Sequence, residues 1–276
     1  MTTNYFYKNT KSKFLEISGQ DSVPFIQNLI TNDINKCKEN HFVYSCLLTP
    51  QGKFFADFFI FKNKEKYFFE VNDIFYENFL NKLNMYKLRS NINIEEIKLF
   101  YSFIIFGKLE INNHYEILNF DPRNNNIGKK LIQYDPLIKF NEKIIEIDEK
   151  KYHEILIKNK VPYSPFDLQE NKSLLLENNF DNINAISWNK GCFVGQEITA
   201  RMKYRALLKK QLYALELISG KINIGDKIIE KGTVLGEVIS KANQYIFCIL
   251  KIELVREKSE KKALLDIDSS TTLKFL

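Results

Sequence analysis

The feature that most constrains the fold is a change in the character of the chain near residue 201. Beyond it, four of the ten glycines fall between residues 220 and 236, among short runs rich in β-branched and aromatic residues. These runs span residues 212–218, 227–229, 234–239 and 245–254. Short β-rich runs separated by tight turns predict a small antiparallel barrel or sandwich, with the charged run 258–262 at the tip of a hairpin.

The preceding 200 residues alternate strand and helix signals. Two aromatic strands, at residues 54–61 and 67–71, are joined by a charged turn. Asp73 is expected to cap the helix that follows, and Asp21 or Ser22 an earlier one, because these side chains accept hydrogen bonds from the first helical amides. A further helix is expected over about residues 144–159. This alternation predicts an α+β fold.

Composition and charge exclude several classes of protein. Hydrophobic residues make up 45% of the chain and charged residues 27%, which excludes global disorder. The 40 basic and 34 acidic residues leave a net charge of +6, which favours an anionic ligand or a weak nucleic-acid encounter but is diagnostic of neither. No run of 18 apolar residues and no secretion signal is present, so a cytoplasmic protein with no membrane partner is expected.

The four cysteines and three histidines are scattered along the chain. The cysteines form no CxxC pair, which is typical of reduced thiols in a cytosol-like compartment. The histidines show no metal-ligand spacing, so no metal site is predicted.

Residues 187–201 form the most unusual segment. It reads Ser-Trp-Asn-Lys-Gly-Cys-Phe-Val-Gly-Gln-Glu-Ile-Thr-Ala-Arg, with glycines on both sides of Cys192. Helical character from Gln196 onward places Cys192 just before a helix N-terminus, and this position together with Lys190 would favour the thiolate. From spacing alone a second interpretation stays open, in which Cys192 is a small buried hydrophobic residue.

Lys-Gly-Cys-Phe-Val-Gly-Gln-Glu at residues 190–197, followed by Ala-Arg, resembles the signature of YgfZ-type folate-binding proteins. These belong to the aminomethyltransferase (glycine-cleavage T-protein) superfamily, which includes mitochondrial iron–sulfur assembly factors. Residues 25–33, residues 48–53 and Asp121-Pro122-Arg123 with Gly128 also resemble motifs of the family, and the resemblance covers about the whole chain.

The resemblance implies three lobes around a central opening that binds tetrahydrofolate or a one-carbon derivative of it. Residues 1–49 and 131–200 are expected to form a discontinuous α+β first lobe, which carries the loop at 190–197. Residues 50–130 are expected to form an inserted α+β lobe, and residues 201–276 the β-barrel.

The resemblance also implies the residues of a folate site. Glu177 matches the family position at which a glutamate addresses the pterin, and such pairing would offset the cost of burying a carboxylate. Arg201 and Lys203 are candidates for the carboxylate tail. Without the family, all three would read as solvated surface charges. Cys192 is expected to act as the reactive thiol. The other expected folate contacts are Lys190, Phe193, Gln196, Glu197, Asp57 and Tyr86, although Tyr86 also continues the apolar stripe of its helix.

Ala56 distinguishes the chain from true aminomethyltransferases, which carry two adjacent acidic residues where this chain has Ala56-Asp57. A methyl group cannot accept a proton. The resemblance therefore implies a tetrahydrofolate-binding accessory protein for the assembly or maintenance of iron–sulfur enzymes, with no defined turnover. The alternatives are an aminomethyltransferase of glycine cleavage acting on aminomethyl-lipoyl protein, and an RNA-binding or tRNA-modification accessory module.

The expected partners are folate and iron–sulfur enzymes or their assembly proteins. No direct nucleic-acid partner is expected, because the chain has no aromatic RNA-binding motif and no dense basic helix. Ligation of a cluster by four thiolates would need partner chains, since the cysteines are far apart in sequence. The protein itself is expected to be a monomer.

Overall fold

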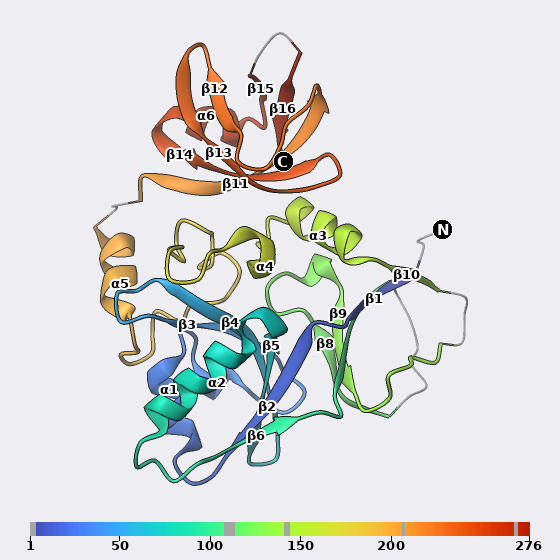
Figure 1. Cartoon of the computed structure of the whole chain (residues 1–276), viewed down its shortest axis with the longest axis vertical. Helices are drawn as coiled ribbons and strands as arrows, with labels where there is room; N and C mark the ends of the chain where they lie inside the picture. Colours follow the sequence, from blue (N-terminus) through green and yellow to red (C-terminus); the bar gives the residue numbers. More distant parts are fainter. Residues whose placement is uncertain (1–3, 108–113, 141–143, 206–207, 268–269) are drawn as a thin grey trace.

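The computed structural model describes residues 4–107, 114–140, 144–205, 208–267 and 270–276. Three sheets and a few helices make up an α+β fold, as the sequence predicts. Figure 1 shows the C-terminal sheet at the top, helices α3 and α4 beneath it, and the other two sheets in the lower body. The six-stranded C-terminal sheet is barrel-like, so the predicted β-barrel is confirmed as well.

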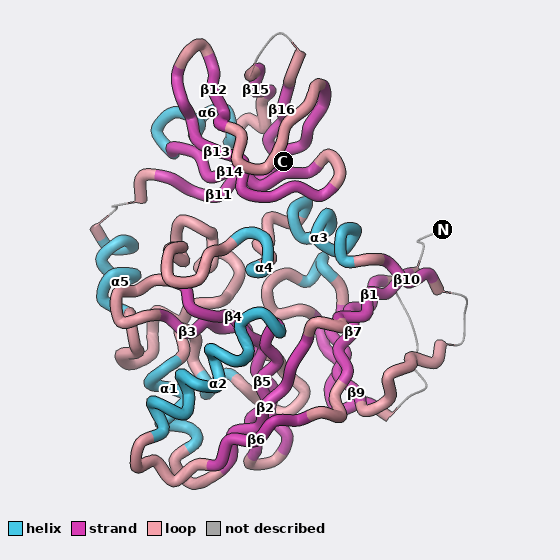
Figure 2. Tube along the Cα trace, viewed as in Figure 1, coloured by secondary structure: helices cyan, strands magenta, loops and turns pink. Residues whose placement is uncertain are grey.

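The helices and strands follow one another in a mixed order, which Figure 2 separates by colour. The helices are α1 (Ser22–Leu29), α2 (Asp73–Lys87), α3 (Glu149–Lys158), α4 (Ser164–Asp167), α5 (Gln196–Tyr204) and α6 (Ile252–Glu260), with short 3-10 turns η1 (Ile34–Lys36) and η2 (Asn125–Ile127). The strands are β1 (Tyr5–Asn9), β2 (Ser12–Ser18), β3 (Val43–Leu48), β4 (Phe54–Asn63), β5 (Lys66–Asn72), β6 (Asn93–Ile97), β7 (Tyr101–Phe106), β8 (Tyr115–Phe120), β9 (Lys129–Gln133), β10 (Ile145–Ile147), β11 (Lys210–Ser219), β12 (Lys227–Glu230), β13 (Thr233–Ala242), β14 (Tyr245–Lys251), β15 (Leu264–Asp266) and β16 (Thr272–Phe275).

The sheet of order β3-β4-β5-β2-β6 contains the predicted aromatic hairpin, whose strands are β4 and β5. Side chains alternate across β4, so that Phe54, Phe58 and Ile60 are buried on one face. Helix α2 covers this face, with the rings of Phe58 and Phe79 4.9 Å apart. Burial of this aromatic layer fixes the register of the hairpin, because a shift by one residue would expose it.

The second sheet has the order β10-β1-β7-β9-β8. Two connections pass from it to the first sheet: β1 runs on into β2, and β6 runs on into β7. The sheets therefore do not follow the boundaries expected for an inserted lobe. The boundary between residues 49 and 50 falls inside the β3–β4 hairpin, and strands of 50–130 lie in both sheets.

The C-terminal sheet has the order β12-β13-β14-β11-β16-β15 and a separate core that includes Leu215, Ile246 and Leu273. Two predictions are wrong here. The expected strand 245–254 ends at Lys251 and continues as α6, and the charged run 258–262 lies at the end of that helix instead of at a hairpin tip. Val255 is the buried residue that packs the helix into the barrel core.

Two helix caps also differ from expectation. The α2 cap is Asn72, whose side chain accepts a hydrogen bond from Ile74 N. Asp21 precedes α1 but caps no helical amide, because its Oδ2 accepts from Asn91 N at 2.7 Å. The helix expected over 144–159 begins only at Glu149, after the short strand β10. In the described ranges no helix has the length and apolarity needed to cross a membrane.

Candidate functional site

The loop at residues 190–197 is fastened to the C-terminal end of α1. The ammonium of Lys190 donates to the carbonyl oxygens of Gln27 and Ile30, each at 2.6 Å, and of Asn32 at 2.9 Å. A lysine ammonium has three protons to donate, so all are used by these carbonyls. Burial lowers the pKa of Lys190 to about 8, and the charge of Asp33 partly opposes this shift. The loop is therefore held by a partly buried cation whose protons point into the protein.

The same loop packs against the turn at residues 49–53. Gly195 has φ +79°, and a Cβ atom there would lie 2.4 Å from the Thr49 carbonyl oxygen. Gly52 faces it, with an added Cβ 2.7 Å from the Ile198 Cβ. Both positions require glycine, because neither the backbone nor the available space accepts a side chain. Two motifs far apart in the sequence thus meet through their glycines.

Cys192 lies at the exposed edge of this loop, whereas the other three cysteines are buried. Beside it, Gly191 has open space around its Cα. Burial raises the pKa of the Cys37 thiol to about 12 and of the Cys46 thiol well above its ordinary value. Among the described residues, no three His, Cys, Asp or Glu side chains form a group that could hold a metal ion. The exposed loop thiol is thus the accessible cysteine.

A cleft of about 850 Å³ lies between the lower body and the barrel. Its walls come from the segment before Glu177, from α5 and from the barrel. The lining residues are Leu174, Glu177, Met202, Leu208, Lys209, Lys210, Lys251, Ile252, Glu253 and Arg256. The cleft thus combines apolar side chains with four cations and two carboxylates.

One backbone and one side-chain hydrogen bond dock the Glu177 segment onto β11. Leu212 N donates to the Glu177 carbonyl oxygen at 2.7 Å, and Asn179 Nδ2 donates to the Leu212 carbonyl oxygen at 2.7 Å. On the barrel side, Ile252 N donates to the Lys209 carbonyl oxygen at 3.0 Å. The first two bonds fix the walls of the cleft relative to each other, because they join the Glu177 segment to the backbone of β11, and the third holds α6 against the start of the barrel.

The carboxylate of Glu177 is largely covered, with 18% of its side chain exposed. Burial raises its pKa, and the nearby ammonium groups of Lys210 and Lys53 act in the opposite direction. Its Oε2 lies 3.9 Å from Lys210 Nζ, which is a loose ion pair. The carboxylate is therefore poised to accept hydrogen bonds from a bound group.

The cations of the cleft lie close enough to repel each other. Lys210 on β11 lies directly opposite Lys251 on β14. Like charges at directly opposed positions destabilise a sheet. Arg256 on α6 adds a further positive charge to the same wall. An anionic group bound in the cleft would relieve this repulsion, so the arrangement suits a ligand with carboxylates.

Asp57 lies inside the lower body, away from the cleft lining. Its Oδ2 accepts a hydrogen bond from the Tyr44 hydroxyl at 2.5 Å, while its covered Oδ1 has no hydrogen-bond partner among the described residues. Burial raises the pKa of this carboxyl. Arg123 nearby forms a bidentate ion pair with Asp121, in which the guanidinium donates one hydrogen bond to each carboxylate oxygen. Its guanidinium carbon lies 5.2 Å from the centre of the Tyr44 ring. The Asp-Pro-Arg motif thus closes the interior beside Asp57.

The remaining predicted site residues lie outside the cleft lining. Glu197 and Arg201 pair with each other on the exposed face of α5 at 2.7 Å, and Lys203 pairs with Asp181 at 3.0 Å. Phe193 is buried and its amide donates to Gln196 Oε1 at 3.3 Å. Tyr86 packs against the main core, with Lys82 over its ring. Of the predicted set, the structure brings only Glu177 to the cleft, and Cys192 and Lys190 do not line it.

The cations at the cleft were missed by sequence reasoning. Lys209 directly precedes β11, Lys210 begins it, and Lys251 ends the strand that pairs with it. The available signal was a lysine pair at the start of one strand and a lysine at the end of its partner. It becomes informative only when the β11–β14 register is known.

Comparisons with known proteins agree with this architecture. A family model for the GCVT N-terminal domain matches residues 9–104. The glycine cleavage system aminomethyltransferase T from Bartonella henselae superposes with a TM-score of 0.76, over 99% of this chain and 85% of that chain, at 9% identity. At this identity the likeness shows the fold.

Curated relatives place the chain more narrowly. The tRNA-modifying protein YgfZ of Buchnera aphidicola subsp. Schizaphis graminum is 29% identical over 236 residues, which is 77% of this chain and 72% of that protein. The mitochondrial iron-sulfur cluster assembly factor IBA57 homolog of Mycosarcoma maydis is 25% identical over 220 residues, or 73% of this chain. Together these matches support a YgfZ/IBA57-type member of the T-protein-like superfamily.

The matched length differs among the YgfZ/IBA57-type relatives. The chain spans 54% of the Mycosarcoma maydis protein and 52% of the Neurospora crassa IBA57 homolog, about half of each. Within this superfamily, the four matched motifs now have physical roles. The motifs at residues 25–33, 48–53 and 190–197 form one docked unit, and the Asp-Pro-Arg motif closes the neighbouring interior.

Proposed function

We propose that this protein binds tetrahydrofolate, or a one-carbon derivative of it, in the cleft at Glu177, and serves as an accessory factor for iron–sulfur enzymes. The observation that carries the proposal is the cleft itself, whose lining contains the covered carboxylate of Glu177 and four cations. The curated names of two relatives, an iron-sulfur cluster assembly factor and a tRNA-modifying protein, support the accessory role.

The chemistry of the cleft fits folate. A pterin is flat and presents amide and amine groups, from which a carboxylate such as that of Glu177 can accept hydrogen bonds. Leu174, Met202 and Ile252 supply an apolar slot. The tail of folate carries carboxylates, for which the lysines of β11 and β14 are suited. The volume of about 850 Å³ is within the range of small-molecule sites, roughly 300–1,000 Å³.

Cys192 would act at a site on this protein separate from the folate cleft. Its loop is exposed and lies outside the cleft lining, so we assign it to contact with a partner protein instead of with the folate. Ligation of a cluster by four thiolates would then draw on cysteines of that partner.

Aminomethyl transfer to folate is disfavoured by Ala56. This residue is buried in β4, and by the family resemblance it takes the position at which aminomethyltransferases carry the first of two acidic residues. The adjacent Asp57 is bonded to Tyr44 inside the body. A methyl group can neither accept a proton nor orient an amine, so the accessory role is the function we favour.

Calorimetric titration with tetrahydrofolate tests the proposal. Glu177→Gln should weaken binding by 10-fold or more, about 1.4 kcal/mol, since a charged hydrogen bond is worth roughly 1.5–3 kcal/mol. Glu257→Gln is the matched control, because this exposed carboxylate pairs with Lys261 on α6 and should leave the affinity unchanged. Equal affinity of the Glu177→Gln variant and the unchanged protein would remove Glu177 from the site.

The pH dependence gives a second readout. Because burial raises the pKa of Glu177, its carboxylate is protonated at a higher pH than an ordinary glutamate. Protonation removes the charge that accepts the pterin donors. Folate affinity should therefore fall with decreasing pH sooner than an ordinary carboxylate would allow, and the Glu177→Gln variant should lack this fall.

A further inference from the structure

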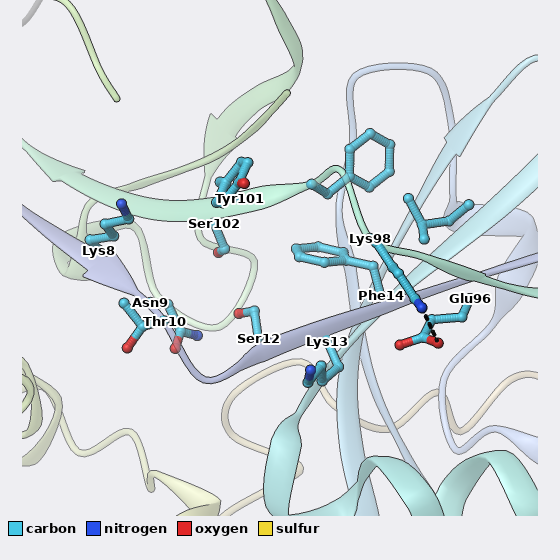
Figure 3. Close-up of a pocket in the computed structure, with 12 residues that line it drawn as sticks. Lys8, Asn9, Thr10, Ser12, Lys13, Phe14, Glu96, Lys98, Tyr101 and Ser102 are labelled. Carbon is cyan, nitrogen blue, oxygen red and sulfur yellow. Dashed lines mark ion pairs between the residues drawn. The ribbon is translucent and has the colours of Figure 1, made fainter. Parts of the chain in front are cut away.

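A second hollow, of about 570 Å³, lies at the seam between the two lower sheets and shares no lining residue with the barrel cleft. The seam is formed where β1 continues into β2 and β6 continues into β7. We call this hollow the seam groove. Figure 3 shows its lining, with Lys8, Asn9, Thr10 and Ser102 at one end and Phe14, Glu96 and Lys98 at the other.

The charge of the seam groove is positive. Lys8, Lys13 and Lys98 line it against the single carboxylate of Glu96. Lys98 Nζ lies 4.0 Å from Glu96 Oε2, and both side chains are exposed, so this pair contributes little. The Lys13 ammonium makes no hydrogen bond or ion pair with any described residue, and the Lys8 ammonium uses one of its protons on the Pro136 carbonyl oxygen. The rim therefore has ammonium protons available for an anion.

The floor of the groove carries a buried hydroxyl with a proton to donate. Ser102 is 1% exposed, and its Oγ accepts a hydrogen bond from Lys130 Nζ at 3.1 Å. Because the ammonium supplies that proton, the hydroxyl proton of Ser102 must point elsewhere. No described residue accepts it, and Ser102 lines the groove. A ligand acceptor atom at this end would satisfy it.

A buried ion pair holds this floor in place. Lys130 Nζ lies 2.7 Å from Glu70 Oε2, and Ser12 Oγ donates to Glu70 Oε1 at 2.5 Å. Both charged side chains are almost fully buried. Burying such a pair carries a desolvation cost that its attraction does not always offset. What the pair provides here is a fixed position for the Ser102 hydroxyl on the groove floor, whereas the hydroxyl proton of Ser12 is already donated to Glu70.

The other end of the groove is apolar and aromatic. The rings of Phe14 and Phe100 meet edge to face with centroids 5.5 Å apart, and Ile97 lies beside them. The carboxylate of Glu96 stands at this end (Figure 3). A ligand that fills the groove thus has an anionic end, a flat apolar body, and an amine that a carboxylate can accept.

We propose that the seam groove binds a nucleoside monophosphate whose base carries an exocyclic amine. Its phosphate lies between Lys8 and Ser102, whose hydroxyl proton is available to a phosphate oxygen, and its base lies beside Phe14. Glu96 accepts from the exocyclic amine, the same pairing by which acidic side chains read cytosine. The nucleotide is either free or the terminal residue of an RNA. The site is independent of the folate cleft.

Equilibrium dialysis of the full chain with adenosine 5′-monophosphate tests the assignment. Saturable binding is expected, at least 10-fold tighter than that of adenosine and several-fold tighter than that of uridine 5′-monophosphate. Lys13→Gln and Lys8→Gln should each weaken binding several-fold and reduce its salt dependence. Lys251→Gln in the barrel cleft is the matched control and should leave it unchanged. All three lysines lie at the surface or near it, so folding is preserved.

The outcomes separate cleanly. Absence of saturation, equal affinity for adenosine and its monophosphate, or unchanged affinity in both seam-groove variants would each overturn the site. Equal affinity for the adenosine and uridine monophosphates would overturn the role of Glu96. A 5′-phosphorylated tetraribonucleotide distinguishes the sources: binding 10-fold tighter than the mononucleotide assigns the groove to RNA ends, and equal or weaker binding assigns it to free nucleotide.

Discussion

Replacing Gly195 by alanine separates two costs that the loop at 190–197 imposes on the chain. The first is conformational, because φ is +79° and an L-residue in this region costs roughly 1–2 kcal/mol. The second is steric. The new Cβ would lie 2.4 Å from the Thr49 carbonyl oxygen and 2.8 Å from the Leu48 Cβ. Since a backbone carbonyl cannot rotate away as a flexible side chain can, overpacking should add about 1–3 kcal/mol.

Two other glycines provide matched controls. Gly232 has the same φ of +79° but nothing within 4 Å of an added Cβ, so Gly232→Ala should cost only the conformational part. Gly191 also has open space and no positive φ, so Gly191→Ala should change stability by less than about 0.5 kcal/mol. The expected loss for Gly195→Ala is about 2–5 kcal/mol.

Urea denaturation followed by circular dichroism gives the free energy of unfolding of each variant. The expected order of stability is Gly191→Ala, then Gly232→Ala, then Gly195→Ala as the least stable. If Gly195→Ala is no less stable than Gly232→Ala, the loop does not press on the Thr49 turn, and the reasoning about the docked motifs is refuted.

Three further outcomes are expected. Native protein treated with iodoacetamide near neutral pH should be labelled at Cys192 before any other cysteine, because the others are buried; mass-spectrometric mapping that finds a different cysteine first would contradict this. Asp121→Asn should lower the free energy of unfolding by about 3–5 kcal/mol, since it leaves the buried guanidinium of Arg123 unpaired; a loss below 1 kcal/mol in a urea titration would show that the pair is dispensable. Burial lowers the pKa of Lys190 to about 8 from 10.5, so between these pH values the unfolded chain binds more protons and the contribution of Lys190 to stability rises with pH. The stability difference between the protein and its Lys190→Met variant should therefore change across this window, and a constant difference would argue against the shifted pKa.

Much of the fold could be predicted from local patterns. Alternating aromatic residues on both sides of a charged turn predict the β4–β5 hairpin. Glycines in the turns between short β-rich runs predict the barrel. The helix α6 could not be found in this way. Its N-cap, Lys251, makes no side-chain cap hydrogen bond, and the apolar run of β14 continues into the first turn. With only Val255 buried, the helix also leaves little periodicity to detect.

The division of the strands between the two lower sheets was equally hidden. β1 and β2 are separated by two residues, Thr10 and Lys11, which reads as a hairpin turn. In the structure β1 pairs with β7 and β2 with β5, so the two strands belong to different sheets. Pairing of distant strands decides this, and no local pattern encodes it.

The candidate site could be predicted only in part. Glu177 came from the family resemblance, and the structure sets it in a cleft. The expected tail cation Arg201 is instead committed to Glu197, one helical turn away. Pairs at this spacing on a helix are common, and recognising one would have warned against the assignment. The cations that do line the cleft come from segments joined only by strand pairing.

The composition of the barrel cleft has a consequence for how the molecule holds together. Glu177 belongs to the lower body, whereas Lys210, Lys251 and Arg256 belong to the barrel. A ligand that contacts both sides binds only when the barrel is attached to the lower body. By linkage it must therefore strengthen that attachment by the same free energy by which the attachment strengthens ligand binding. At a concentration 100 times its dissociation constant, a ligand of the intact form alone adds about 2.7 kcal/mol to the stability of that form. Under the proposed function, the folate concentration would then set how stably the barrel is attached to the lower body. That attachment in turn would determine which surface of the molecule is exposed to other proteins.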